Sequence, residues 1–213
     1  MKNIDIPDSV TNITTLAFYR CNGLVSVQVP GSVTAIKNGT FRECNNLKKV
    51  ILNEGVAKIE DSAFVFCSSL EQIKLPQSLT SIGSGVFGDC TSLISIELPD
   101  NAIISSSTFR GRKNLSKIVL SDTNNNYTVK NGILYNENMT RILCYPAGIK
   151  DTEFFVPDTV KTIGDFAFYG TKALESINIP DSVTNIGTDA FGECSGLKEV
   201  VIPDSVTSMG EAV

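Results

Sequence analysis

An internal repeat of 23 residues is the feature that most constrains how this chain can fold. The segments that share the repeat are 24–46, 47–69, 70–92, 93–114, 174–196 and 197–213, the fourth one residue short and the last incomplete. Periods of this length are typical of solenoids, because one short unit cannot bury its apolar face alone and stacking the units buries a continuous core.

The repeats share the template L-x-x-I-x-I-P-x-S-V-T-x-I-G-x-x-A-F-x-x-C-x-x. Its start predicts a short strand with alternate apolar residues inward, and the proline ends that strand because it cannot donate to a ladder. V-T-x-I predicts a second extended run, and A-F-x-x-C predicts one helical or 3₁₀ turn with Ala and Phe inward. A glycine between these parts is expected to permit a bend, and it is present as Gly83, Gly164, Gly187 and Gly210.

Stacked units predict a single solenoid domain over residues 1–213 with about nine coils, each advancing by roughly the spacing of paired strands. The terminal coils carry no polar capping unit, and the last coil stops at Val213 before the template is complete. Either the chain is a fragment of a longer array or its ends pack on other molecules. Because an uncovered coil is an open sheet edge, end-to-end self-association through the terminal coils is one partner hypothesis.

The motif I-P-x-S-V-T-x-I-G-x-x-A-F-x-x-C resembles the repeat of the BspA-like leucine-rich repeat family of bacterial and protozoan surface proteins. The resemblance covers nearly the whole chain. It implies a β-rich α/β solenoid, a right-handed superhelix with a concave parallel sheet, short helical or 3₁₀ turns on the back and one inserted β-hairpin. It also implies binding or adhesion rather than catalysis, and a place at the cell surface or in secretion.

The repeat breaks at residues 121–152, which carry β signals of their own. Asn131-Gly132 lies between two extended runs, which is typical of a hairpin turn. We expect a β-hairpin or three-stranded meander on the side or convex face, with the strands at Ile118 and Phe154 still neighbours in the main sheet. The excursion could brace the fold or form a binding arm, and the frequency of such inserts in the family favours bracing.

Five cysteines occupy one template position, namely Cys21, Cys44, Cys67, Cys90 and Cys194, while Arg112 and Thr171 occupy it in two other coils and Cys144 lies in the insert. A row of thiols one coil apart is linear rather than tetrahedral, so it does not suit a zinc site. Neighbouring coils are within disulfide reach, but pairing would pull the side chains out of the core. We therefore expect buried, reduced thiols that pack as small apolar groups.

The amino-acid composition excludes several classes of function. The sequence contains no histidine, which removes the commonest general base and the usual nucleophile dyads, so we expect no catalytic residues, no metal and no cofactor. A net charge of −5 argues against nucleic acid, which favours a basic face. No run of eighteen apolar residues occurs, so we expect no direct membrane insertion.

The candidate binding site is the outward side of the first strand of each coil, because this side varies from coil to coil. Its candidate residues are Gln28, Lys49, Ile51, Gln72, Lys74, Glu97, Lys117, Val119, Phe155, Asn178 and Val201. An exposed Phe155 beside Val119 in a neighbouring coil would form an apolar patch with a polar rim, which suits a protein interface. The alternative is that outward β positions simply favour β-branched and aromatic residues.

These observations favour a non-enzymatic protein-binding or adhesion module, part of a cell-surface or secreted protein that engages host or matrix proteins through its concave face. A solenoid presents a wide, rigid surface with little ordering cost on binding. The alternatives are a structural spacer or stalk and, since the chain shows no export signal, an intracellular protein-interaction scaffold.

Overall fold

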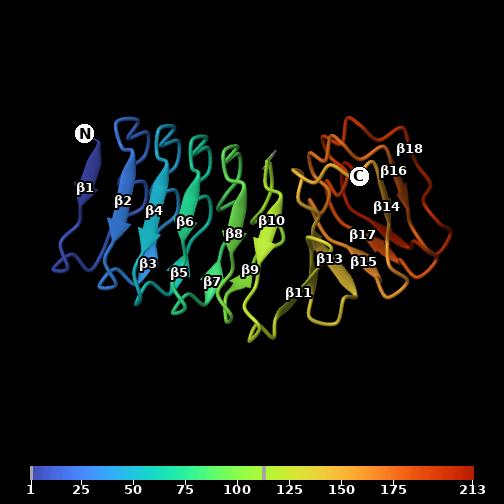
Figure 1. Ribbon diagram of the computed structural model, residues 1–213, viewed down its shortest axis with the longest axis horizontal. Coiled ribbons are helices and arrows are strands. Elements are labelled where there is room, and N and C mark those ends of the chain that lie inside the picture. Colours follow the sequence, from blue (N-terminus) through green and yellow to red (C-terminus); the bar gives the residue numbers. More distant parts are fainter. Residues whose placement is uncertain (1, 112–113) are drawn as a thin grey trace.

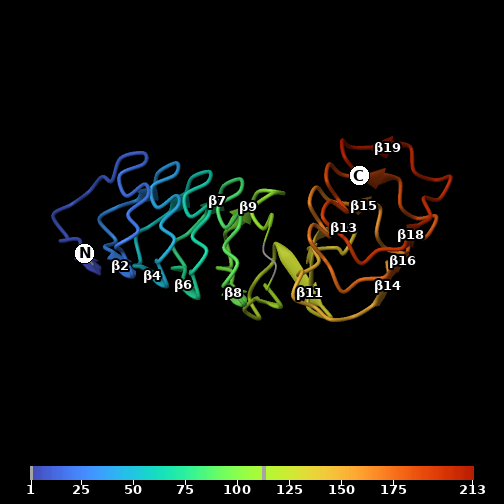
Figure 2. The same ribbon diagram turned by 90° about the horizontal axis from the view of Figure 1, so that it is seen from above.

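The computed structural model describes residues 2–111 and 114–213, which form an elongated rod of stacked coils (Figures 1 and 2). The N-terminal coils (blue to green) follow one another along the long axis of the molecule, whereas the C-terminal coils (orange to red) stack at a steep angle to that axis. The predicted β-solenoid is therefore confirmed. Arg112, at the template position of the cysteines, lies outside the described residues.

One side of the rod is built from the first strand of each coil. These strands are β1 (Asn3–Asp5), β2 (Ser26–Val29), β4 (Lys49–Leu52), β6 (Gln72–Lys74), β8 (Ser95–Glu97), β10 (Lys117–Val119), β14 (Glu153–Phe155), β16 (Ser176–Asn178) and β18 (Glu199–Val200). Neighbours pair in parallel and in template register, as Val27 pairs with Val50. Apolar residues such as Val27 and Val29 are buried while Gln28 between them is exposed. We call the outward side of these strands the strand face.

A second side is built from the V-T-x-I runs and from the insert. Its strands are β3 (Ala35–Ile36), β5 (Lys58–Ile59), β7 (Ser81–Ile82), β9 (Ile103–Ile104), β11 (Tyr127–Lys130), β12 (Ile133–Asn136), β13 (Arg141–Cys144), β15 (Thr162–Ile163), β17 (Asn185–Ile186) and β19 (Ser208–Met209). The short strands pair in parallel, as Ile36 pairs with Ile59. The second extended run of the template is thus confirmed.

The third side, the back, differs from the prediction. No residue in the described ranges is helical, and the A-F-x-x-C segments form chains of turns instead of helical or 3₁₀ turns. The amide of Phe41 donates to the carbonyl of Ala63 in the next coil at 2.8 Å, whereas the amide of Cys44 donates locally to Phe41 at 3.2 Å. A helix would direct every amide along its own axis, so the turns prevail because alternate amides bond to the adjacent coil.

The template glycine is also required for a different reason than the one predicted. Gly83 is not in the left-handed region, but a Cβ on it would lie only 2.8 Å from the backbone nitrogen of Asp61 in the preceding coil. The left-handed residues that follow Gly83 in the same coil are Gly85 (φ 60°) and Asp89 (φ 55°), and their counterparts one coil earlier are Ser62 (φ 57°) and Phe66 (φ 61°). The glycine therefore permits close approach between coils, and the bend is made by other residues.

A ladder of phenylalanine rings fills the core behind the back. Phe18, Phe41, Phe64, Phe87 and Phe109 stack in sequence, with ring centroids 5.2, 5.3, 6.1 and 6.4 Å apart. The ring planes of the first two pairs are nearly parallel, at 5° and 3° to each other. Aromatic contacts of this kind add to the stabilisation from area burial, so the ladder locks the orientation of each coil to the next.

The insert forms the three-stranded meander that the sequence predicts. Strands β11, β12 and β13 pair antiparallel in order, and β13 then pairs in parallel with β15 on the second side. The β11–β12 turn has left-handed Asn131 (φ 52°) and Gly132 (φ 80°), as expected for an Asn-Gly hairpin turn. The meander is thus an integral part of the second-side sheet.

The strands of Ile118 and Phe154 are not neighbours, so that prediction is wrong. The strand face is divided into three sheets, β1-β2-β4-β6, β8-β10 and β14-β16-β18. Strands β11 and β13 appear between β10 and β14 in Figure 1. The cause is that the meander adds strands β12 and β13 to the second side, beyond the usual one strand per coil, while adding no strand to the strand face. Val119 and Phe155 are consequently not paired across adjacent strands.

Strand β12 separates two apolar cores. Leu134 packs in the core of the N-terminal coils, whereas Ile133 and Tyr135 pack in the core of the C-terminal coils. All three side chains are buried. Because successive residues of a strand point to opposite faces, one strand seals both cores, and this arrangement favours bracing over a binding arm.

Replacing Leu134 by alanine should therefore destabilise the protein by about 2–5 kcal/mol, the usual range for an unfilled buried leucine site. The measurement is urea unfolding followed by circular dichroism. Lys130→Ala, at an exposed position of the same meander, is the matched control and should change the unfolding free energy by less than about 0.5 kcal/mol. Equal, small effects of both variants would show that the meander does not brace the cores.

Candidate functional site

The predicted binding residues lie on the strand face, with their side chains alternating with the buried ones. Those that are exposed are Gln28, Lys49, Gln72, Lys74, Glu97, Lys117, Phe155, Asn178 and Val201, while Ile51 and Val119 are half-buried. The period of two in the sequence is sufficient to place them there. Their role in binding stays a prediction.

The apolar part of this face differs from the predicted patch. Val119 pairs with Glu97, whereas Phe155 pairs with Asn178. Ile177 pairs with Val200 of the next coil, so Val201 directly follows the paired residue as Asn178 follows Ile177. Phe155 and Val201 are 63% and 68% exposed. We call Phe155, Asn178 and Val201 the C-terminal strip. It keeps Phe155 as its centre but replaces Val119 with Val201.

Charge is distributed unevenly along the strand face. Lys49, Lys74 and Lys117 lie on the N-terminal part, whereas Glu153 and Glu199 lie on the strands of the C-terminal strip. Beside these glutamates is a hollow of about 430 Å³, and its lining residues are Thr152, Glu153, Glu175, Ser176, Lys198 and Glu199. Lys198 and Glu175 form an ion pair of 2.6 Å, which leaves two carboxylates unneutralised at this edge.

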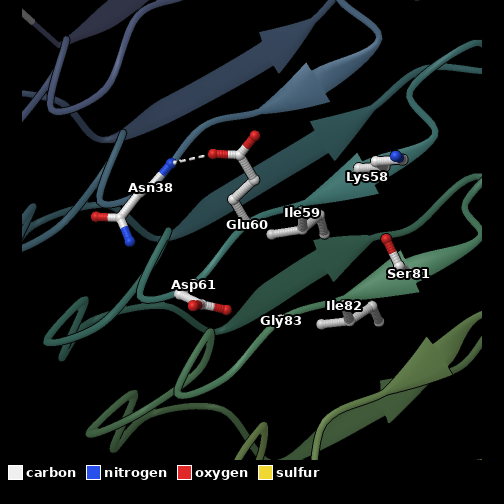
Figure 3. A pocket seen from close by; sticks show the side chains of 8 residues that line it. All are labelled: Asn38, Lys58, Ile59, Glu60, Asp61, Ser81, Ile82 and Gly83. Carbon is white, nitrogen blue, oxygen red and sulfur yellow. Dashed lines mark hydrogen bonds between the residues drawn. The ribbon is translucent and has the colours of Figure 1, made fainter.

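A cavity of about 370 Å³ lies on the second side, at the ends of β5 and β7 (Figure 3). The Glu60 carboxylate accepts hydrogen bonds from the Lys37 ammonium at 2.9 Å and from the Asn38 amide at 3.0 Å, and the bond from Lys37 is the main cause that lowers the pKa of Glu60. Asp61 accepts from the Ser84 amide at 2.8 Å. These carboxylates therefore link neighbouring coils while they border the cavity.

Sequence reasoning missed this second-side cavity because it searched only the first strand of each coil. A signal was present in the residues that follow V-T-x-I. Asn38, Asp61 and Ser84 occupy one template position in successive coils, and all three are polar. Only the stacked coils show that the row borders a hollow rather than a flat surface.

The cysteine row packs as predicted. All six cysteines are in the thiol form, Cys44, Cys67, Cys90 and Cys144 are buried, and Cys21 and Cys194 are half-buried. The thiol of Cys44 donates to the carbonyl of Phe18 at 3.0 Å, and that of Cys67 to the carbonyl of Phe41 at 3.1 Å. Burial raises the pKa of Cys44 from 9.0 to about 11, and burial also raises the pKa of Cys67 well above its usual value.

Across residues 2–111 and 114–213, no three cysteine, aspartate or glutamate side chains converge in a way that would hold a metal ion. In the same ranges, no helix has the length and apolarity needed to cross a bilayer.

Comparison with known families explains the repeat. The model of the BspA type leucine-rich repeat region matches residues 1–116, 34–153 and 144–213, in six copies. The chain belongs to this family. Leucine-rich repeat proteins of this type are typically surface or protein-interaction proteins and are generally not enzymes. The resemblance predicted from the template is thus confirmed.

Solved structures show the same fold. A leucine-rich repeat protein from Eubacterium ventriosum is 31% identical with a TM-score of 0.79, and the match covers 92% of this chain and 58% of that protein. The Treponema pallidum leucine-rich repeat protein TpLRR is 28% identical with a TM-score of 0.58, over 95% and 78% of the two chains. A leucine-rich cell surface protein from Faecalibacterium prausnitzii, 24% identical, shares the fold with a TM-score of 0.52 over 98% and 77%. No curated protein sequence matches the chain.

The raised thiol pKa values predict that alkaline pH destabilises the protein. In the unfolded chain Cys44 loses its proton near pH 9, whereas the folded chain keeps it up to about pH 11. The stability that Cys44 contributes is thus present below about pH 9 and is lost as the pH rises toward 11. Urea unfolding at a series of pH values should show a slope of about −1.4 kcal/mol per pH unit for each such thiol.

Cys44→Ala is the control for this titration. It lowers stability at neutral pH because it removes a buried group, but it should make the alkaline slope shallower by one thiol's contribution. If the slope is unchanged in this variant, the alkaline loss of stability does not come from ionisation of the Cys44 thiol.

Proposed function

We propose that this chain is a non-enzymatic protein-binding module of a cell-surface or secreted protein, and that it engages host or matrix proteins through the strand face. The observation that carries the proposal is the C-terminal strip. Phe155 and Val201, both more than half exposed, lie on one row with a polar residue between them. Exposed apolar groups with a polar rim are typical of protein interfaces.

The surroundings of the strip indicate what kind of partner fits. Glu153 precedes Phe155 by two residues on the same outward side, and Glu199 is the corresponding neighbour of Val201. Of the carboxylates that line the hollow, Glu175 pairs with Lys198, whereas no ion pair among residues 2–111 and 114–213 includes Glu153 or Glu199. A partner surface that presents an apolar side chain beside basic residues would complement this part of the face.

The rigidity of the scaffold supports recognition. Each coil is held by backbone hydrogen bonds to the next, and ring stacking continues in the C-terminal coils, where Tyr145, Phe168 and Phe191 are 5.1 and 5.4 Å apart. Side chains on such a surface are ordered before the partner arrives, which lowers the entropic cost of association.

The proposed surface location is supported by the family and by the F. prausnitzii protein that shares the fold, which is a leucine-rich cell surface protein. The match with the E. ventriosum protein spans 58% of that protein's length, so its remaining part has no counterpart here. The proposal therefore covers binding by this module alone, and it assigns no activity to the rest of a longer protein.

The test is binding of the purified chain to immobilised collagen, laminin and fibronectin by surface plasmon resonance. Phe155→Ala should weaken binding to a recognised protein by about tenfold, as expected for an exposed aromatic anchor, and Val201→Ser should weaken it in the same direction. Ile103→Ser is the matched control, because Ile103 is 65% exposed but lies on the second side.

Two results would overturn this proposal. Binding that is equally strong in Phe155→Ala, Val201→Ser and Ile103→Ser would remove the strand face as the site. No binding to any of the three matrix proteins would favour the spacer hypothesis, in which the solenoid only holds another domain at a distance.

A further inference from the structure

A groove of about 650 Å³ lies on the back of the N-terminal coils, away from the strand face. One wall is the polar row that begins with Asn38 and Asp61, which also border the cavity in Figure 3. Ser84 and Ser107 continue this row through the next two coils. The groove thus runs along the rod, and its volume is within the range of small-molecule sites.

The floor of the groove is hollow because its residues are small. Gly85 and Gly88 lie there with Ser62. A Cβ on Gly85 would meet no atom closer than the Ser62 hydroxyl at 3.9 Å, so the space above Gly85 is open. The groove therefore extends across coils rather than ending at each coil.

Backbone groups on the floor are already used between coils. The amides of Ser62 and Phe66 donate to the carbonyls of Ser84 and Gly88 at 2.9 and 2.8 Å, and the amide of Gly85 donates to Ser107 at 3.3 Å. An extended peptide binds a sheet edge mainly through main-chain hydrogen bonds. The floor offers no such edge, so the ligand must be recognised by side chains.

The far end of the groove is aromatic. The Phe66 side chain lines it and the residue is 43% exposed. Phe166, from the coils beyond the meander, also lines it, and the Arg110 guanidinium lies 4.9 Å from the Phe166 ring centroid and 5.5 Å from that of Tyr169. These contacts hold the guanidinium over aromatic faces at the groove's edge.

The charges that line the groove are balanced. Arg42 and Arg110 provide two positive groups, and Asp61 and Asp89 provide two negative groups. Because the positive and negative side chains are equal in number, the groove favours neither an anionic nor a cationic ligand. Planar carboxylate, amide and guanidinium groups can, however, each form hydrogen bonds with a pair of adjacent hydroxyl groups.

We propose that this groove binds a neutral glycan. Its hydroxyl groups would bond to Asn38, Asp61 and Arg110, and the apolar C–H face of one sugar ring would pack on Phe66. A neutral carbohydrate complements the groove in three respects. It has no net charge, its adjacent hydroxyl groups can bond to the polar side chains, and one face of its ring is apolar. The site is separate from the strand face, so it does not depend on the proposed protein partner.

Saturation-transfer NMR and calorimetry with cellohexaose, maltohexaose, mannohexaose and N-acetylchitohexaose test the proposal, with an oligogalacturonate as the charged comparison. At least one neutral oligosaccharide should bind. Phe66→Ala should weaken that binding by about tenfold, since a stacking surface is removed. Ile103→Ala, at an exposed second-side position that does not line the groove, is the matched control and should leave glycan binding unchanged.

A second variant keeps the test independent of folding effects at Phe66. Ser62→Asn keeps the left-handed backbone, which asparagine tolerates, and fills the floor, so it should also weaken binding. Failure of all four neutral oligosaccharides to bind, equal binding of the oligogalacturonate, or unchanged binding in both variants would overturn the proposal. Loss of matrix-protein binding in Phe66→Ala without any glycan binding would reassign the groove to a protein partner.

Discussion

Hydrogen bonding between adjacent coils is the interaction on which the rest of this structure depends. Each coil is only 23 residues long and has no regular structure that could be stable alone, since its strands contain two to four residues. Within each sheet the strands on two sides pair with those of the next coil, and alternate amides on the back bond to the next coil as well. Stacking in register then brings equivalent side chains together, which produces both the phenylalanine ladder and the thiol row.

The meander modifies this regularity without ending it. Because it adds two strands to the second side and none to the strand face, strands β10 and β14 do not pair and the strand face is interrupted between Val119 and Glu153. The core divides at the same point, yet β12 contributes side chains to both parts, and Arg110 contacts Phe166 on the outside. One insertion thus separates two stretches of surface while keeping the apolar interior sealed.

Repetition and variation have different roles in the surfaces. Positions that must fit the adjacent coil, such as the buried Phe64 and Cys67, recur with little change because packing tolerates few alternatives. Outward positions such as Lys74 and Phe155 contact only solvent and their lateral neighbours, so they can differ from coil to coil. The proposed binding surfaces both lie at such variable positions, supported by the invariant interior.

The sequence by itself determined the repeat, the family, the two extended runs, the Asn131-Gly132 turn and the inward or outward direction of each strand residue, because these depend on local spacing. The structure alone decided what depends on contacts between coils. Turns replace the expected helical segments because alternate amides find carbonyls in the next coil. Phe155 lies beside Asn178 and not Val119, since the two added strands β12 and β13 displace its coil from β10. The groove near Phe66 likewise arises only when residues from several coils and from beyond the meander converge.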